Sequence, residues 1–249
     1  MFDCPEPSVS HYFQWKRYID FPIALLLSVI VLPVIALLYL LVRLTSRGPG
    51  IYKQVRLGLD GKPFTMYKIR TMRVNAEAAT GVVWATRNDK RVTSVGRILR
   101  KTHLDELPQL YNVLRGDMAL VGPRPERPEF VTELEKRIDG YGYRLYVMPG
   151  LTGLAQLNQN PNVDLNDVRR KLVLDFEYIE DASFLFDMRL FCCTAFKTVR
   201  LCKPAVLNFF RVCRKAEKSR WVTSLPLTTY ASPEDEEHLS KILSKQATV

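Results

Sequence analysis

A stretch of 22 residues without a charged side chain, residues 21–42, constrains this chain more than any other feature of its sequence. At about 1.5 Å per residue, a straight helix of this length reaches roughly 33 Å, which is enough to cross a bilayer. A cleaved signal peptide is the main alternative, but large apolar residues continue from Val34 to Val42 without a small-x-small cleavage site. We therefore expect the segment to remain and to hold the chain in a membrane.

The path of this segment through the membrane is left open by the residues around it. Lys16 and Arg17 precede it, and Arg43 and Arg47 follow it, so the distribution of positive charge favours neither orientation. Pro33 lies near the middle, where it removes a backbone hydrogen bond, and we expect the helix to bend there. The residues alone favour a kinked helix that crosses the membrane over a re-entrant helix that dips in and returns.

The charge balance predicts a partner with negative charge. Lys plus Arg number 36 against 26 Asp plus Glu, a net charge of +10 that attracts nucleic acid, anionic lipid or phosphorylated substrates. Nucleic acid is not expected, because no stretch interleaves aromatic and cationic residues as single-strand binders do. A membrane-tethered basic module without chemistry is the rival hypothesis. The 5 cysteines lack zinc-site spacing and suggest a reducing, cytoplasmic environment without a disulfide framework.

The remaining pattern predicts an α+β fold without a convincing second domain. Alternation over 51–57 and 63–69, around Asp60-Gly61, predicts a β-hairpin. Helical spacing covers 95–114 and ends at Gly116, whereas prolines make 120–128 extended. We expect further helices over 129–139 and 166–178, a loop or turn over 148–156, and interfacial amphipathic helices within 184–214. Ser232-Pro233 followed by acidic residues predicts a final short helix.

The stretch "LDELPQL" places two carboxylates, Asp105 and Glu106, where a helix begins. One interpretation is a capping box in which Asp105 pairs with Thr102. Because Pro108 is better tolerated in a first turn, a helix starting at residue 104 or 105 is preferred. At that position, free N–H groups and the helix dipole can hold a phosphate and keep a carboxylate ionised. Asp105 is then a candidate nucleophile, and both carboxylates could serve one hard cation.

Cationic side chains could complete a diphosphate site beside this pair: Lys68, Arg70, Arg100 and Arg124. Arg124 stands between Pro123 and Pro125, and such a stiff backbone would present a guanidinium at low entropic cost. The alternative is that these residues are ordinary solvated cations.

Four stretches of the sequence resemble one family: "KRYID", "GPGIYKQVRLGLDGKPFTMYKIRTM", "RVTSVGRILRKTHLDELPQLYNVLRGDMALVGPRPE" and "VMPGLTGLAQ". They are similar to the bacterial sugar transferase family, the monotopic phosphoglycosyl transferases that begin glycan assembly on polyprenyl phosphate. The resemblance covers residues 15–195. It implies a re-entrant helix broken at a proline like Pro33, and a catalytic domain on the cytoplasmic face of the bacterial inner membrane. The segments would be 1–15, 16–47 (the re-entrant helix), 48–200 (the catalytic domain) and 201–249 (a basic, helical tail).

The resemblance also implies roles for the candidate residues. Asp105 would attack the sugar-bearing phosphorus of a UDP-sugar and release UMP, and polyprenyl phosphate would then collect the phosphosugar. Glu106, together with Asp105, would hold Mg²⁺. Arg124, between its two prolines, would grip the nucleotide phosphate. His103 is expected to be structural. The implied partners are a UDP-sugar, polyprenyl phosphate and anionic membrane lipid, with homodimerisation left open.

One departure from the family pattern bears on the sugar. Some members that transfer an acetamido sugar phosphate continue after Ala-Gln with Asn-Gly-Arg, whereas this chain has Asn158, Gln159 and Asn160 after Leu157. The missing arginine slightly favours a hexose such as glucose or galactose. The sequence leaves the sugar, the glycan pathway and the role of 201–249 open.

Overall fold

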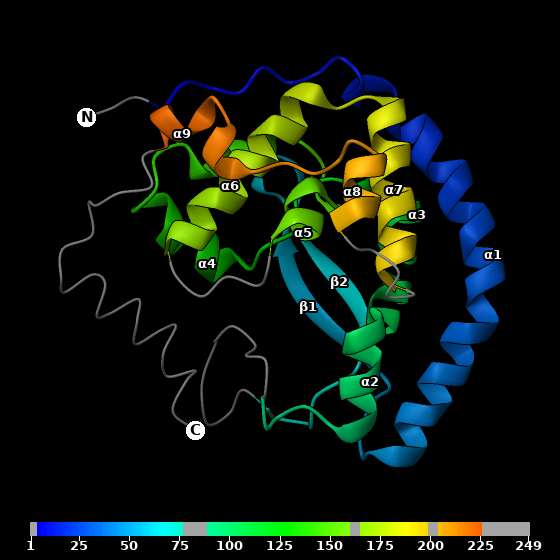
Figure 1. Cartoon of the computed structure of the whole chain (residues 1–249). Coiled ribbons are helices and arrows are strands. Elements are labelled where there is room, and N and C mark those ends of the chain that lie inside the picture. Colours follow the sequence, from blue (N-terminus) through cyan, green and yellow to red (C-terminus); the bar gives the residue numbers. More distant parts are fainter. Residues whose placement is uncertain (1–3, 77–88, 160–164, 199–203, 226–249) are drawn as a thin grey trace.

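A single helix of 33 residues, α1 (Phe13–Thr45), contains the whole apolar stretch. The computed structural model describes residues 4–76, 89–159, 165–198 and 204–225. Among these, α1 is the one helix long and apolar enough to cross a membrane, and little of its most apolar part is buried in the protein. Figure 1 shows α1 following an arc along one side of the molecule.

α1 is not interrupted near Pro33, where a break was expected. The helix runs through both Pro22 and Pro33 without a gap. A proline removes one hydrogen bond but leaves the turns on either side intact, so the chain can curve without losing its helix. The expectation of a broken helix was therefore wrong for the secondary structure.

The β-hairpin is confirmed with its predicted bounds. Strands β1 (Ile51–Leu57) and β2 (Pro63–Ile69) pair antiparallel, with Ile51 opposite Ile69. The turn contains the short 3-10 helix η1 (Leu59–Gly61), in which Asp60 and Gly61 have φ of 54° and 70°. Both residues tolerate this left-handed region better than others, which is why Asp-Gly predicts the turn.

The predicted helix over 95–114 consists of three pieces. α2 (Ser94–Thr102) ends at His103, a 3-10 helix η2 (Leu104–Gln109) follows, and α3 (Leu110–Arg115) closes at Gly116. Pro108 lies inside η2, where the tighter 3-10 turn replaces the α-helix. The apolar residues of these pieces are still buried, but in two places, because Leu99 packs with Leu38, Val42 and Ile69, whereas Leu110 and Val113 belong to the main core.

A small parallel sheet was not predicted. β3 (Ala119–Val121) pairs with β4 (Gly150–Thr152), and α5 (Leu154–Asn158) follows directly. The expectation of a loop or turn over 148–156 was therefore wrong. The strands are too short to show alternation, and their pairing depends on contacts between segments about 30 residues apart in sequence.

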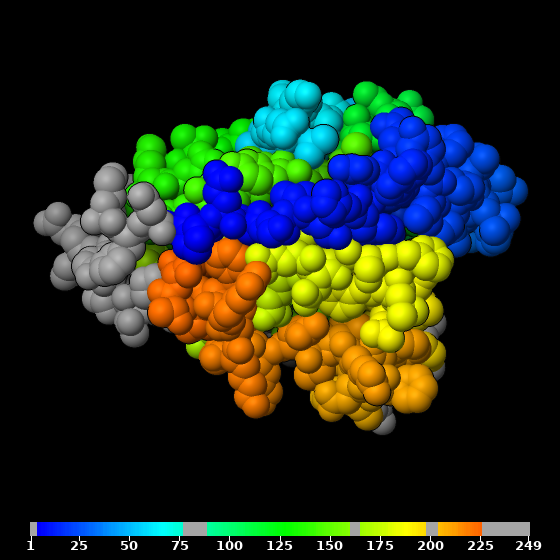
Figure 2. Space-filling view, turned by 90° about the horizontal axis from the view of Figure 1, so that it is seen from above, coloured from blue at the N-terminus to red at the C-terminus, as the bar shows by residue number. Residues whose placement is uncertain are grey.

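The core is built around α6 (Leu165–Asp181), whose buried residues include Leu172, Phe176 and Ile179. α4 (Pro128–Glu135) and the 3-10 helix η3 (Tyr141–Tyr146) lie on the same side of the molecule (Figure 1). Seen from above, the N-terminal segment crosses between the layer of β1, β2 and α4 and the layer of α6 to α9 (Figure 2). It is bonded there, since the Ser10 amide donates to the Ile179 carbonyl at 3.2 Å.

The C-terminal part is helical. α7 (Phe184–Thr198) is followed by α8 (Pro204–Phe209), the 3-10 helix η4 (Ala216–Lys218) and the short α9 (Trp221–Ser224). The helices expected within 184–214 are thus present, and α7 and α8 expose the large apolar residues Phe184, Leu185 and Phe209. The final helix expected after Ser232-Pro233 lies outside the described residues.

Candidate active site

A turn with a left-handed residue presents the two carboxylates. His103 has φ of 56° and separates α2 from η2, so Asp105 and Glu106 lie in the first turn of η2. The Thr102 hydroxyl donates to the carbonyls of Ile98 and Leu99 at 3.0 and 3.1 Å, so it does not cap the following helix. The capping-box interpretation was therefore wrong, and the predicted start at residue 104 is confirmed, although the helix is a 3-10 helix of 6 residues.

Glu106 forms ion pairs with two cations from distant parts of the chain. Lys68 Nζ, from β2, lies 2.7 Å from Glu106 Oε1, and Arg124 Nη2, after β3, lies 2.8 Å from the same oxygen. The Lys68 and Glu106 side chains are mostly shielded from solvent. Charge-assisted contacts of this length are strong, and neither of them uses Oε2.

The segment that carries Arg124 is held by its backbone. The Gly122 amide donates to the Thr152 carbonyl and the Gly150 amide to the Pro123 carbonyl, both at 2.8 Å. A Cβ on Gly150 would stand 2.0 Å from the Gly122 nitrogen, so only glycine permits this approach. With Pro123 and Pro125 on either side, the backbone of Arg124 has little freedom.

Arg144 also holds the segment that carries Arg124. Its Nη2 donates to the Arg124 carbonyl at 3.0 Å and lies 2.8 Å from Asp175 Oδ2. Arg144 also reaches Glu126, which Lys171 contacts too. Burial raises the pKa of Glu126, but Lys171, Arg144 and Arg56 outweigh it and lower the pKa to about 2. The sequence analysis missed Arg144 and its partners, because they share no motif and meet only in the folded chain.

The pKa values of the two carboxylates are shifted in opposite directions. Burial and the neighbouring charge of Glu106 raise the pKa of Asp105, which is 7% exposed, although Lys68, Arg100 and Arg124 act in the opposite direction. For Glu106, burial raises the pKa as well, but Arg124 and Lys68 lower it well below its ordinary value. The helix dipole was expected to favour the ionised form of Asp105, but the pKa shift of Asp105 has the opposite direction. The short η2 gives little dipole, and burial dominates.

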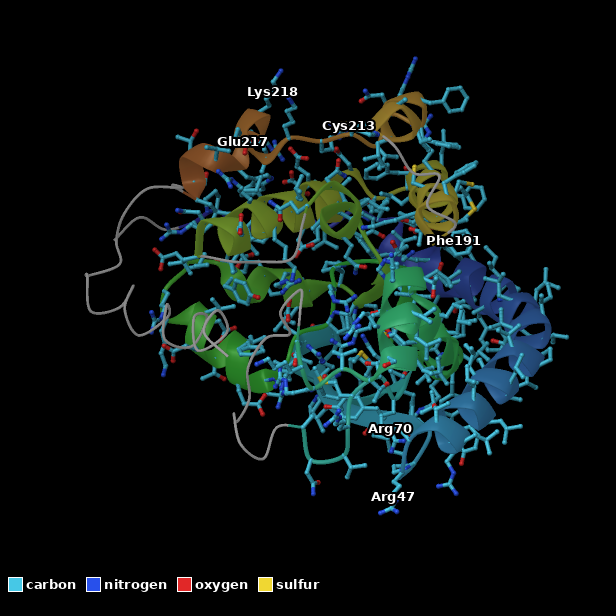
Figure 3. The ribbon with its side chains drawn as sticks, turned by 60° about the horizontal axis from the view of Figure 1, so that its bottom comes forward. Arg47, Arg70, Phe191, Cys213, Glu217 and Lys218 are labelled. Atoms are coloured by element: carbon cyan, nitrogen blue, oxygen red, sulfur yellow. The ribbon has the colours of Figure 1, made fainter. Side chains whose placement is uncertain are left out.

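The other predicted cations are divided between two places. The Arg100 guanidinium donates from Nε to Thr71 Oγ1 at 2.8 Å and is close enough to Asp105 to affect its pKa. Arg70, in contrast, donates from Nη2 to the carbonyl and hydroxyl of Ser46 at 3.0 and 2.7 Å. Figure 3 shows Arg70 near Arg47, at the end of α1. Arg70 thus fastens α1 and does not point at the carboxylates.

The donor set can be tested against the expected Mg²⁺. No group of three or more His, Cys, Asp or Glu side chains forms a metal cage within the described ranges. Mg²⁺, however, is commonly held by one or two carboxylates together with water and substrate phosphates. Asp105 and Glu106 fit that mode, because they are adjacent and the two cations on Glu106 occupy Oε1.

The long apolar helix and the buried carboxylates with their cations are consistent with a transferase that works at a membrane, and the comparisons with known proteins identify the class. Residues 11–201 match the model of the family described as "Bacterial sugar transferase". The chain belongs to this family.

Several curated relatives carry more specific names. UDP-glucose:undecaprenyl-phosphate glucose-1-phosphate transferase of Escherichia coli (strain K12) is 41% identical over 199 residues, covering 79% of this chain and 42% of the relative. The enzyme of the same name from Caulobacter vibrioides is 42% identical over 177 residues, covering 70% of this chain and 66% of the relative.

A third relative acts on another sugar. UDP-N-acetylgalactosamine-undecaprenyl-phosphate N-acetylgalactosaminephosphotransferase of Aeromonas hydrophila is 40% identical over 185 residues, covering 74% of this chain and 43% of the relative. The chain thus spans less than half the length of two of these three relatives and about two thirds of the other.

Proposed function

We propose that this protein transfers a sugar 1-phosphate from a UDP-sugar to polyprenyl phosphate and releases UMP. The single observation that carries the proposal is the buried Asp105 beside Glu106, with Lys68 and Arg124 on Glu106. A nucleophile next to fixed cations suits a diphosphate substrate, and the names of the relatives supply the substrate class. In a bacterium, this would be a first membrane step of glycan assembly.

Asp105 would act as the nucleophile in the first step. A carboxylate oxygen of Asp105 attacks the phosphorus that carries the sugar, the bond from this phosphorus to the UMP oxygen breaks, and UMP leaves. A phosphosugar then stands on Asp105. In the second step an oxygen of polyprenyl phosphate attacks the same phosphorus, the bond to Asp105 breaks, and the carboxylate is restored. The product is a polyprenyl diphosphate sugar, and no proton is gained or lost by the enzyme.

The surrounding charges would lower the barrier by positioning and by charge stabilisation. Lys68, Arg100 and Arg124 all lower the pKa of Asp105 and so favour the form that attacks. Arg124 would bind a nucleotide phosphate from a backbone that needs no reordering. Glu106, with Asp105, would hold Mg²⁺, which would offset negative charge on the diphosphate and on the departing UMP.

We also propose that α1 enters and leaves the membrane on the side of the catalytic domain. At its start, Asp20 Oδ2 accepts a hydrogen bond from the Leu120 amide at 3.0 Å. At its end, Ser46 is held by Arg70. A helix bonded to one domain at both ends is difficult to place across a bilayer, which supports the re-entrant form over the crossing helix.

The sugar remains a choice between two classes. The relatives include transferases named for glucose and for N-acetylgalactosamine. Ala155 and Gln156 are followed here by Leu157, Asn158 and Gln159, whereas some acetamido-sugar enzymes continue with Asn-Gly-Arg, so a hexose is slightly favoured.

The test is intact-protein mass spectrometry after exposure to a panel of UDP-sugars, together with a UMP assay in the presence of polyprenyl phosphate. We expect a phosphohexose adduct on Asp105, and we expect Asp105→Asn to abolish both the adduct and UMP release. The exposed Asp60→Asn is the matched control and should keep both.

Folding of Asp105→Asn can be checked by its Tm. Burial raises the pKa of Asp105 in the folded protein, so its contribution to stability is lost as the pH rises through that pKa. At neutral pH the ionised carboxyl therefore costs stability, and a neutral Asn should give a Tm equal to or above that of the wild type. Undiminished UMP release by this variant, or release of UDP in place of UMP, would refute the proposal.

A further inference from the structure

A cavity of 210 Å³ lies between α1, η2 and α7, beside the candidate active site. Its walls are mainly apolar, and Leu27 and Val31 of α1 form the side next to the membrane helix. Phe191 of α7 forms part of the opposite wall, and Figure 3 shows it on that helix. Glu106 belongs to the same lining, so the cavity adjoins the site that the proposed chemistry uses.

Polar groups gather at one part of this lining. Lys197 Nζ donates to the Gln156 carbonyl at 2.5 Å, which places its ammonium group beside α5. The side-chain nitrogen of Gln156 is buried and has no hydrogen-bond partner within the described part of the chain. His103, which precedes η2, lines the same cavity as Lys197. The lining therefore combines a cation and a buried donor with Glu106 and His103.

We propose that this cavity receives the phosphate end of the polyprenyl phosphate acceptor, with Lys197 as the residue that binds its phosphate. The proposal rests on the proposed function and names where its second substrate enters. An ammonium beside an apolar chamber matches a ligand with a phosphate on a hydrocarbon chain. A UDP-sugar, which is polar along its whole length, would leave the apolar walls unpaired.

The size and place of the cavity fit the head of such a lipid. Cavities that enclose drug-sized ligands measure about 300–1,000 Å³, so 210 Å³ takes only the first isoprene units. The rest of a long chain would then lie in the membrane along α1, which exposes apolar residues on the faces that do not line the cavity, including Leu26, Val29 and Ile30. The phosphate would reach the phosphosugar on Asp105 from the membrane side.

The test separates the two substrates by steady-state kinetics of the full chain in detergent micelles, with undecaprenyl phosphate and UDP-glucose as the varied substrates, or whichever UDP-sugar the panel identifies. We expect Lys197→Ala to raise the KM for undecaprenyl phosphate about tenfold, the effect of losing one charge-assisted contact. The KM for the UDP-sugar and the formation of the Asp105 adduct without lipid should stay unchanged. Lys197→Arg should restore most of the affinity for the lipid, and a merely structural role would not predict that the loss in Lys197→Ala is confined to the KM for the lipid.

Lys218→Ala is the matched control for net charge, because Lys218 is exposed on the C-terminal segment, away from Phe191 (Figure 3). A second pair tests the apolar wall without touching a charge. Val31→Trp should fill the cavity and raise the same KM, whereas Leu32→Trp, at a position that is 64% exposed, should not. Both tryptophan variants should form the adduct normally.

The outcomes distinguish the two proposals. If the wild type forms no adduct and releases no UMP, the proposed function fails. If the wild type is active and Lys197→Ala keeps the wild-type KM for undecaprenyl phosphate, the acceptor binds elsewhere and this inference is overturned. A rise in the KM for the UDP-sugar alone would assign Lys197 to the donor and would overturn it as well.

Discussion

Asp105 and Glu106 are neighbours in the chain, yet their carboxyls have opposite pKa shifts. The pKa of Asp105 is raised, mainly by burial, whereas the cations on Glu106 overcome burial and lower its pKa. Two carboxylates in one site with separated pKa values are a common arrangement for groups with different tasks. Glu106 is the permanent negative charge that organises Lys68 and Arg124, and Asp105 is the group whose charge depends on its surroundings.

The raised pKa of Asp105 predicts where activity is lost at acidic pH. The attacking form is ionised, so kcat/KM should fall as the pH drops through the raised pKa, above the ordinary value of about 3.9. Arg100→Gln removes a charge that lowers this pKa, and the acid limb should move to higher pH. UMP release measured from about pH 4, near the ordinary pKa of an aspartate, to neutral pH checks this.

Arg97→Gln is the control for this shift, because Arg97 lies on the same helix, is exposed and is not among the main charges that shift the pKa of Asp105. It should leave the acid limb in place. If the acid limb of the pH profile is unchanged in Arg100→Gln, or shifts to lower pH, Asp105 is not the group whose titration limits kcat/KM.

At the scale of elements, α1 is joined to the domain by a buried charge cluster. Lys16 lies 3.2 Å from Asp20 and also contacts Asp187 of α7, and the Lys16 and Asp187 side chains are 4% and 1% exposed. The hydroxyls of Tyr12 and Tyr178 donate to Asp187 at 3.0 and 2.8 Å. Because these groups are shielded from water, each depends on its partners.

Asp187→Asn should therefore destabilise the attachment of α1. Removing one partner of a buried pair costs about 3 kcal/mol, which corresponds to a fall in Tm of about 6–12 °C for a chain of this size. Asp181→Asn breaks only the exposed pair with Arg214 and should cost less than about 1 kcal/mol. Thermal unfolding in detergent compares the two variants, and equal Tm values would contradict a supporting role for the cluster.

At the scale of the whole molecule, the attachment of α1 at both ends predicts a membrane topology. His11 and Arg47 are exposed and stand before and after the helix. If α1 is re-entrant, single cysteines at both positions, in a chain whose 5 native cysteines are replaced, should react with a membrane-impermeant thiol reagent from the same face of a vesicle. A crossing helix would give labelling from opposite faces.

The secondary-structure elements that could be predicted from the amino-acid sequence are those that depend on residues close together in the chain. The Asp60-Gly61 turn gives the hairpin its bounds, the charge-free stretch gives α1, and the "LDELPQL" pattern places two carboxylates at a helix start. These features depend on φ preferences, hydrophobicity and chain stiffness, which act between near neighbours.

Which side chains meet, and how their pKa values shift, depends on the packing of the folded chain. In the folded chain, Lys68 and Arg124 contact Glu106, whereas Arg70 lies at the end of α1. β3 pairs with β4, and a cavity lies between α1 and α7. The pKa of Asp105 likewise follows from burial by segments far away in the chain. Such contacts have no local signal, because burial and charge pairing are properties of the packed molecule.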